Sequence, residues 1–137
     1  MSDISIPARE PYQIPVDDAV VPFEVATLDM RGRVVRLGPA LDHILGRHDY
    51  PTPVCKLLGE AIVLTVLLGA SLKFEGRFIL QTQSDGPVRM LVVDYRSPGM
   101  IRAYAQFDAD RISALSEATA GNLLGRGDCL IVKARRT

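Results

Sequence analysis

Three segments of the chain alternate apolar and polar residues with the period of two that is typical of β-strands. They run roughly from Arg77 to Gln83, from Val88 to Tyr95 and from Met100 to Phe107. Turn-forming residues separate them at Ser84 to Pro87 and at Arg96 to Gly99. The pattern therefore predicts an antiparallel meander of three strands.

The two faces of this meander differ in polarity. One face of the last two strands carries no arginine and consists of Val88, Met90, Val92, Ile101, Ala103, Ala105 and Phe107. The other face mixes apolar, aromatic and basic residues: Arg89, Leu91, Val93, Tyr95, Arg102, Tyr104 and Gln106. We expect the arginine-free face to pack in the core beneath a helix, which leaves the mixed face outside.

Two helices are predicted upstream of the meander. Pro39 suits the first turn of a short helix, in which Leu41, Ile44, Leu45 and His48 form one apolar stripe. A second helix is expected from near Pro53 to about Leu72, with Thr52 as its cap. Its apolar residues cover most of its circumference, which predicts burial on several sides.

The remaining segments complete an α+β fold, in which an antiparallel or mixed β-sheet packs against a buried central helix and a shorter helix. Residues 1–18 contain three prolines and are expected to be a flexible leader, so the core is assigned to residues 19–137. Phe23 to Leu37 is strand material, perhaps folded on itself, with Gly32 at a tight turn or a bulge. Ile112 to Leu124 suggests a weak helix, and Cys129 to Ala134 a last strand with an open edge.

Composition narrows the class of protein. Hydrophobic residues make up 47% and charged residues 23% of the 137 residues, as in a soluble globular domain. Sixteen basic residues balance sixteen acidic ones, so no global field favours nucleic acid or an anionic membrane. The polar start lacks a signal peptide, and the apolar run from Ala61 to Leu72 is shorter than the ~20 residues of a membrane span. We expect a cytoplasmic protein.

Few residues offer chemistry. His43 and His48 lie five residues apart, about 140° around a helix axis, so they do not share a face. Cys55 and Cys129 lack the spacing of a zinc or dithiol motif and are expected to be reduced, buried thiols. Neither Ser84 to Pro87 nor Gly125 to Asp128 precedes a helix, so both are weak phosphate loops. We therefore predict no enzyme and no cofactor or metal in this chain.

The remaining signal is a surface. Aromatic and arginine residues are favoured where proteins bind other proteins. We predict that client or dimer contacts are made by Leu91, Val93, Tyr95, Tyr104, Arg89 and Arg102. The alternative is that this face is covered by the first strand of the chain or by elements beyond its C-terminal end.

An ordered set of short motifs resembles one known family over roughly residues 19 to 134. The motifs are Arg31-Gly32, His48-Asp49-Tyr50-Pro51 with Pro53-Val54, Leu72-Lys73-Phe74, Asp85-Gly86-Pro87, and Leu123 to Gly127 leading into Cys129 to Val132. In this order they resemble the N-terminal core of the bacterial redox-regulated thirty-three-kilodalton heat-shock chaperone family.

The resemblance implies an ATP-independent holdase that binds unfolding proteins under oxidative stress and heat and is a dimer when active. In that family a C-terminal domain holds zinc through CxC and CxxC pairs, and neither Cys55 nor Cys129 matches those positions. The resemblance therefore implies an N-terminal fragment or a truncated relative, with zinc only in the domain that this chain lacks. The alternative function is a small-molecule-binding module or an enzyme that uses His48, Asp49 and Asp85.

Overall fold

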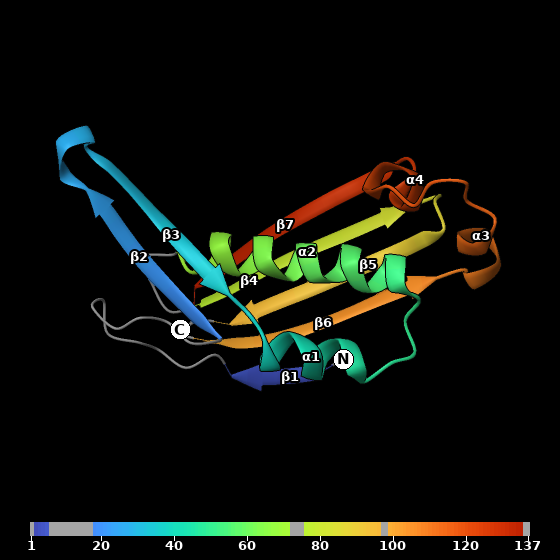
Figure 1. Cartoon of the computed structure of the whole chain (residues 1–137), viewed down its shortest axis with the longest axis horizontal. Helices are drawn as coiled ribbons and strands as arrows, with labels where there is room; N and C mark the ends of the chain where they lie inside the picture. The colour runs from blue at the N-terminus through green and yellow to red at the C-terminus, as the bar shows by residue number, and fades with distance from the viewer. Residues whose placement is uncertain (1, 6–17, 72–75, 97–98, 136–137) are drawn as a thin grey trace.

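A five-stranded antiparallel sheet forms the centre of the molecule (Figure 1). The structure, a computed structural model, describes residues 2–5, 18–71, 76–96 and 99–135. The strand order is β1-β6-β5-β4-β7, and the strands span Ser2–Ser5 (β1), Met100–Phe107 (β6), Val88–Arg96 (β5), Gly76–Ser84 (β4) and Gly127–Arg135 (β7). The predicted meander and the last strand are thus confirmed. Residues 97 and 98 of the second reversal lie outside the described residues.

A separate two-stranded hairpin projects from the sheet at one end of the molecule (Figure 1). It consists of β2, Ala19–Val25, and β3, Met30–Arg36, joined by a 3-10 turn at Ala26–Leu28. The segment is therefore folded on itself, but the turn is not at Gly32. Gly32 lies inside β3 opposite Phe23, whose ring lies so close that a Cβ atom at position 32 would clash with it.

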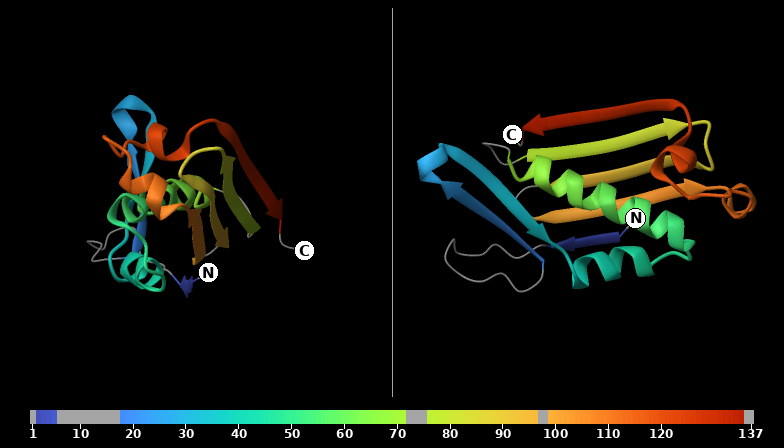
Figure 2. Two further views of the ribbon diagram at one scale, coloured as in Figure 1. Left: turned by 90° about the vertical axis from the view of Figure 1, so that its right-hand side faces the viewer. Right: turned by 45° about the horizontal axis from the view of Figure 1, so that its top comes forward.

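Two helices lie on the same face of the sheet, and the described residues leave the other face uncovered (Figure 2). They are α1, Pro39–Gly46, and α2, Thr52–Gly69, so the predicted α+β fold is confirmed. Thr52 is not the cap of α2, because it is already helical and Pro51 precedes it without a side-chain hydrogen bond. The expected end at Leu72 lies outside the described residues.

The predicted helix from Ile112 to Leu124 is instead two short helices, α3, Ala109–Ser113, and α4, Ala120–Leu124. Each has its own N-terminal cap. The Asp108 carboxylate accepts hydrogen bonds from two backbone N–H groups of α3, and the Thr119 hydroxyl accepts one from Asn122. A capping residue in the middle of the segment starts a second helix there rather than continuing the first.

The face of β5 that packs under α2 is the opposite of the predicted one. Strands β5 and β6 pair Leu91 with Ala105, Val93 with Ala103 and Tyr95 with Ile101, and all six side chains are buried. The prediction had assigned Met90 and Val92 to this side. Because side chains alternate along a strand, an error of one residue in the pairing transfers every side chain to the other face.

A β-bulge explains part of this error. The register shifts between Val88 and Met90, which leaves Arg89 as the extra residue of β5. Val88 and Leu91 are therefore both buried although three positions separate them, while Arg89 is exposed. A bulge of this kind breaks the period of two on which the assignment of faces relied.

Part of the predicted leader belongs to the fold. Ser2–Ser5 pairs with Met100 to Ala103 as the edge strand β1. Asp18 is buried, and its carboxylate accepts hydrogen bonds from the backbone N–H groups of Gly38 (3.0 Å) and Ala40 (3.0 and 3.1 Å) at the start of α1. The prediction of a structureless leader is thus wrong for these residues, while residues 6–17 lie outside the described part.

An ion pair with a buried carboxylate joins β4 and β5 on the face away from α2. Two nitrogens of Arg77 donate to the Asp94 carboxylate at 2.9 and 2.7 Å, and a nitrogen of Arg96 lies 3.8 Å from it. The Asp94 side chain is only 3% exposed, whereas that of Arg77 is 47% exposed. The hydrogen bonds to Asp94 raise the pKa of Arg77, which stays charged.

Replacing Arg77 with Met should destabilise the fold, because the Asp94 carboxylate would remain buried without its main partner. We expect Arg77→Met to lower the free energy of unfolding by about 1–3 kcal/mol. Chemical unfolding of Arg77→Met, Asp94→Asn and the double variant measures this in a double-mutant cycle. Strictly additive effects would contradict a direct coupling between the two side chains.

Candidate functional site

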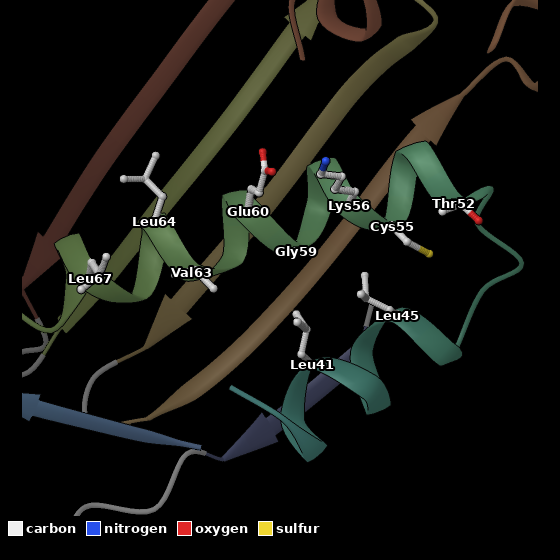
Figure 3. A pocket seen from close by; sticks show the side chains of 10 residues that line it. All are labelled: Leu41, Leu45, Thr52, Cys55, Lys56, Gly59, Glu60, Val63, Leu64 and Leu67. Carbon is white, nitrogen blue, oxygen red and sulfur yellow. The ribbon is translucent and has the colours of Figure 1, made fainter. Parts of the chain in front are cut away.

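An apolar groove runs between α1 and the outward side of α2 (Figure 3). It has a volume of about 620 Å³. One wall comes from α1 and the other from α2, and the lining residues are Leu41, Leu45, Thr52, Cys55, Lys56, Gly59, Glu60, Val63, Leu64 and Leu67. Its size falls within the range of small-molecule and peptide pockets, roughly 300–1,000 Å³.

The groove exists because α2 is apolar on more sides than the sheet can cover. Leu58, Ile62 and Val66 are fully buried toward the sheet, whereas Leu64 is 48% and Leu68 38% exposed. The predicted burial on several sides is therefore wrong for the outward side. Between the two helices Gly59 has no side chain, and an added Cβ would lie 3.8 Å from a methyl group of Leu41, in ordinary contact.

By length and apolar composition alone, α2 would also qualify as a membrane span, and 44% of it is buried inside the structure. This is weak support for a membrane role, because the core helix of a soluble protein passes the same test. The packing of its inner side on the sheet favours the reading as a core helix.

Polar groups are few in the groove. Lys56 and Glu60 lie one helical turn apart on its rim, and Thr52 lies at one end (Figure 3). The half-buried thiol of Cys55 donates a long hydrogen bond of 3.6 Å to the backbone carbonyl of Tyr50. This lining can bind apolar groups, but it offers no arrangement of acid, base and nucleophile for catalysis.

The loop between α1 and α2 is held by aromatic contacts. The Tyr50 ring lies 5.9 Å from that of Phe107 and 5.3 Å from that of His48, and His48 also meets Tyr104 edge-on at 5.8 Å. The backbone N–H of Ala105 donates to the Tyr50 hydroxyl at 3.4 Å. Tyr50 thus covers the part of the β6 edge that β1 does not pair with, and fixes the start of α2.

The predicted contact residues do not form one surface. Leu91, Val93 and Tyr95 are buried beneath α2, so the prediction that they are exposed is wrong. Tyr104 pairs with Val92 on the opposite face and is half-buried, as is Arg102, while Arg89 is exposed at the bulge. A role of Tyr104, Arg102 and Arg89 in client or dimer contacts stays a prediction.

The residues of the alternative hypothesis do not come together in the hollow beside Asp85. That hollow, of about 400 Å³, is lined by residues of the β4–β5 turn, α3 and α4, and neither His48 nor Asp49 belongs to it. The Asp85 carboxylate accepts a hydrogen bond of 2.8 Å from the backbone N–H of Arg126. It therefore fastens the chain ahead of β7.

Asp85 and Gly86 are held from two sides. The backbone N–H of Asp85 donates to the Arg126 carbonyl at 2.9 Å, and Arg111 donates to the carbonyls of Asp85 (2.9 Å) and Gly86 (3.3 Å). A Cβ at Gly86 would lie 2.5 Å from the backbone of Leu124. The motif is thus a structural clasp between the β4–β5 turn and the entry to β7.

The two cysteines lie on different elements of the fold. Cys55 lies on α2 and Cys129 is exposed on β7, so only one of the two thiols is even partly buried. In the part of the chain that the structure describes, no group of three or more His, Cys, Asp or Glu residues is placed to hold a metal ion.

The sequence does contain a signal for the groove: α2 has more apolar positions than one buried stripe requires. Val63, Leu64 and Leu67 lie outside the stripe that packs on the sheet, and Leu41 and Leu45 of α1 point toward the side of α2 that carries Val63 (Figure 3). Such surplus apolar positions on a helix beside a shorter helix indicate a surface that neither element fills.

Comparison with known proteins identifies the family. The family model described as "Hsp33 protein" matches residues 18–137. The chain belongs to the Hsp33 family. Among curated relatives, the 33 kDa chaperonin of Caulobacter vibrioides (strain NA1000 / CB15N) is 54% identical over 116 residues, which are 82% of this chain and 38% of that protein. The 33 kDa chaperonin of Aliivibrio fischeri (strain MJ11) is 42% identical over 104 residues, 76% of this chain and 35% of that protein.

The fold agrees with a solved member of the Hsp33 family. The crystal structure of the 33 kDa chaperonin of Thermotoga maritima superposes with a TM-score of 0.70 at 18% identity, over 84% of this chain and 40% of that one. The chain thus spans well under half of the length of these relatives. Their name describes a chaperone, which agrees with the prediction of a protein that is not an enzyme.

Ionisation of Tyr50 should loosen the loop that fixes the groove. Burial raises the pKa of Tyr50 above 10.0, and burial also raises that of Tyr95. The pKa of a tyrosine in the unfolded chain is near 10.0, and that of Tyr50 in the folded protein is higher. The neutral hydroxyl therefore stabilises the fold fully below the unfolded pKa, and this contribution is lost as the pH rises through the folded pKa. We expect the unfolding free energy to fall above about pH 10, and to fall less steeply in Tyr50→Phe. Equal slopes for both proteins, measured by urea unfolding across this pH range, would contradict the assignment.

Substitution of Gly86 should open the clasp. Gly86→Ala places its Cβ against the backbone of Leu124, so we expect a loss of about 1–3 kcal/mol of stability. Gly46→Ala is the matched control, because an added Cβ at the end of α1 meets nothing within 4 Å. Thermal unfolding should show a lower midpoint for Gly86→Ala and an unchanged or higher midpoint for Gly46→Ala. Equal unfolding midpoints for the two variants would show that the β4–β5 turn accommodates the added methyl group without a loss of stability.

Proposed function

We propose that this chain is the client-binding part of an ATP-independent holdase, which binds unfolding proteins in the cytoplasm under oxidative stress and heat. Membership of the Hsp33 family and the chaperonin names of its relatives support this function. Cys55 and Cys129 form no CxC or CxxC pair, so the proposal assigns neither zinc nor a redox switch to these residues.

The observation that carries the proposal is the apolar groove between α1 and α2. A holdase must bind many different sequences, which requires contacts that do not depend on a particular pattern of hydrogen bonds. Leu41, Leu45, Val63, Leu64 and Leu67 supply such contacts. Burial of apolar surface contributes roughly 25 cal/mol per Å² whatever the client sequence.

The rim of the groove limits how long a client stays bound. Lys56 and Glu60 keep the rim of the groove charged and hydrated. Only the central residues of a bound client segment therefore lose their water on binding. Exposed charges of this kind contribute little affinity. Binding is therefore weak at any one segment, which suits a protein that holds its clients and later releases them.

Two loops that contain glycine, Ser84 to Pro87 and Gly125 to Asp128, could have been phosphate-binding loops. Their structure instead supports a mechanism without ATP. Asp85 and Arg126 use their backbone groups and the Asp85 carboxylate to fasten the two loops to each other. Gly127 begins strand β7, so no helix follows to bind a phosphate at its N-terminus. A small-molecule-binding function of His48, Asp49 and Asp85 has no observation in its favour.

The proposal includes a homodimer. The uncovered face of the sheet carries Val92, Tyr104 and Arg102, and β7 exposes Leu130 and Val132 on the same face beside Ile79 and Gln81. Apolar, aromatic and arginine side chains are the composition favoured at protein interfaces. A second copy, a client segment or a further domain placed there would bury this face.

Polar substitutions in the groove test the proposed function. Leu64→Ser combined with Val63→Ser removes two groove side chains without touching the sheet-facing side of α2. Because each loses about 1 kcal/mol of apolar contact, we expect affinity for an unfolded client to fall about tenfold or more. Fluorescence anisotropy with a chemically unfolded, labelled protein measures this, and light scattering of a heated client measures the suppression of aggregation.

Ile131→Ser is the matched control, since Ile131 is exposed to a similar degree but lies on β7 outside the groove and on the opposite face of the sheet from Leu130 and Val132. Unchanged affinity in the groove variant, with an intact circular dichroism spectrum, would show that the groove does not hold clients. Absence of any suppression by the unmodified chain would contradict the holdase function itself.

A further inference from the structure

The β2–β3 hairpin separates apolar from charged residues between its two faces. One side, called here the hairpin apolar face, consists of Val21, Phe23, Val25, Met30 and Val34, with Gly32 opposite Phe23. The other side carries two cross-strand pairs beyond its base, Pro22 with Arg33 and Glu24 with Arg31. Phe23, Met30 and Val34 are each about half exposed, and Leu28 at the turn is 65% exposed.

This exposure is unusual for such a small element. A two-stranded hairpin is marginally stable alone in water and needs a partner for its apolar side. Near the base, Val20 and Val35 of the opposite side pack against the main core. That packing fixes the hairpin to the body but leaves the hairpin apolar face without a covering layer among the described residues (Figure 1).

Phe23 is held in place before anything binds. Its ring lies across Gly32, where an added Cβ would come within 2.3 Å of the ring. Only glycine lets the ring lie directly on the backbone of the neighbouring strand. The result is a flat aromatic surface, half exposed and fixed on one side, which is the kind of residue that dominates binding energy at interfaces.

The size of the face decides among possible occupants. A stable interface commonly engages about 20–30 residues on each side. The hairpin apolar face offers five side chains and the turn residue Leu28. A permanent dimer or a tightly bound folded partner would need a larger surface, so this face suits a short segment bound transiently.

The chemistry of the face points the same way. No charged residue lies on it beyond the base pair of Ala19 and Arg36, so nothing in it selects a partner by charge. Recognition without charge tolerates many sequences, provided that they present apolar side chains.

We propose that the hairpin apolar face is a second client-binding element, which binds extended apolar segments of unfolded proteins against Phe23. The inference rests on the proposed holdase function and adds a surface to it, separate from the groove. An extended segment presents every second side chain to one side, which matches the alternating rows of β2 and β3. Two weak sites on one molecule hold an unfolded chain more tightly than either site alone.

Site-specific photocrosslinking tests the proposal directly. The change Phe23→p-benzoylphenylalanine places a photoreactive group on the hairpin apolar face, and Arg31→p-benzoylphenylalanine places it on the charged side of the same hairpin. Each labelled 137-residue chain is irradiated with a chemically unfolded client and, separately, with the same client in its native state. We expect crosslinks to the unfolded client at least several-fold stronger from position 23 than from position 31, and none to the native client.

Equal crosslinking from both positions, or none from position 23, would overturn the proposal. Crosslinks from position 23 mainly to a second copy of the chain would also overturn it, because the face would then be a dimer contact. These readouts report binding at the hairpin and do not require that aggregation be suppressed.

Two variants separate this proposal from the holdase function. Phe23→Ser removes the ring, and Gly32→Ala displaces it while keeping its chemistry. We expect both to weaken client affinity several-fold, with an unchanged far-ultraviolet circular dichroism spectrum and unfolding midpoint as the control for folding. Full affinity in both variants, together with normal suppression of aggregation, would refute the hairpin site and leave the holdase function intact.

Discussion

Helix α2 carries more apolar surface than one face of a sheet can cover, and much of the structure follows from this excess. Its inner side packs Leu58, Ile62 and Val66 on the sheet, and at its end Gly69 lets the Tyr95 ring approach the helix backbone. Its outer side is left with Leu64 and Leu68 exposed. The short helix α1 covers only part of that remainder, so a groove forms where a longer neighbour would have closed the core. The same imbalance makes a surface for apolar ligands without any dedicated binding loop.

Local patterns in the sequence were sufficient to identify most elements. The periods of two and 3.6 residues located the three strands of the meander and the helices α1 and α2, and turn residues placed the reversals. Patterns failed where a single residue redirects the chain. Asp108 and Thr119 each start a helix of their own, and Ser2–Ser5 becomes a strand only because the edge of β6 is available to pair with it. Such pairing depends on tertiary proximity, which composition does not contain.

The exposed and buried residues of the candidate site were harder to predict from the sequence than the elements of the fold. Leu91, Val93 and Tyr95 were assigned to the surface because arginines were counted on their side of the meander, but the bulge at Arg89 removes one of those arginines from the pattern. The pairing of β5 with β6 then decides the face, and pairing is a property of two strands rather than of either one. The family could be recognised from short motifs, whereas the exposed groove required knowing which side of α2 meets the sheet.

Asp18 has a mechanical consequence. Its carboxylate lies just before β2 and accepts hydrogen bonds from Gly38 and Ala40, just after β3, so one side chain closes the base of the hairpin. The backbone that it grips is the first turn of α1, and α1 is one wall of the groove. The hairpin and that wall of the groove are therefore anchored at the same buried carboxylate. Loss of this one side chain would release the base of one apolar surface and the first turn of the helix that lines the other.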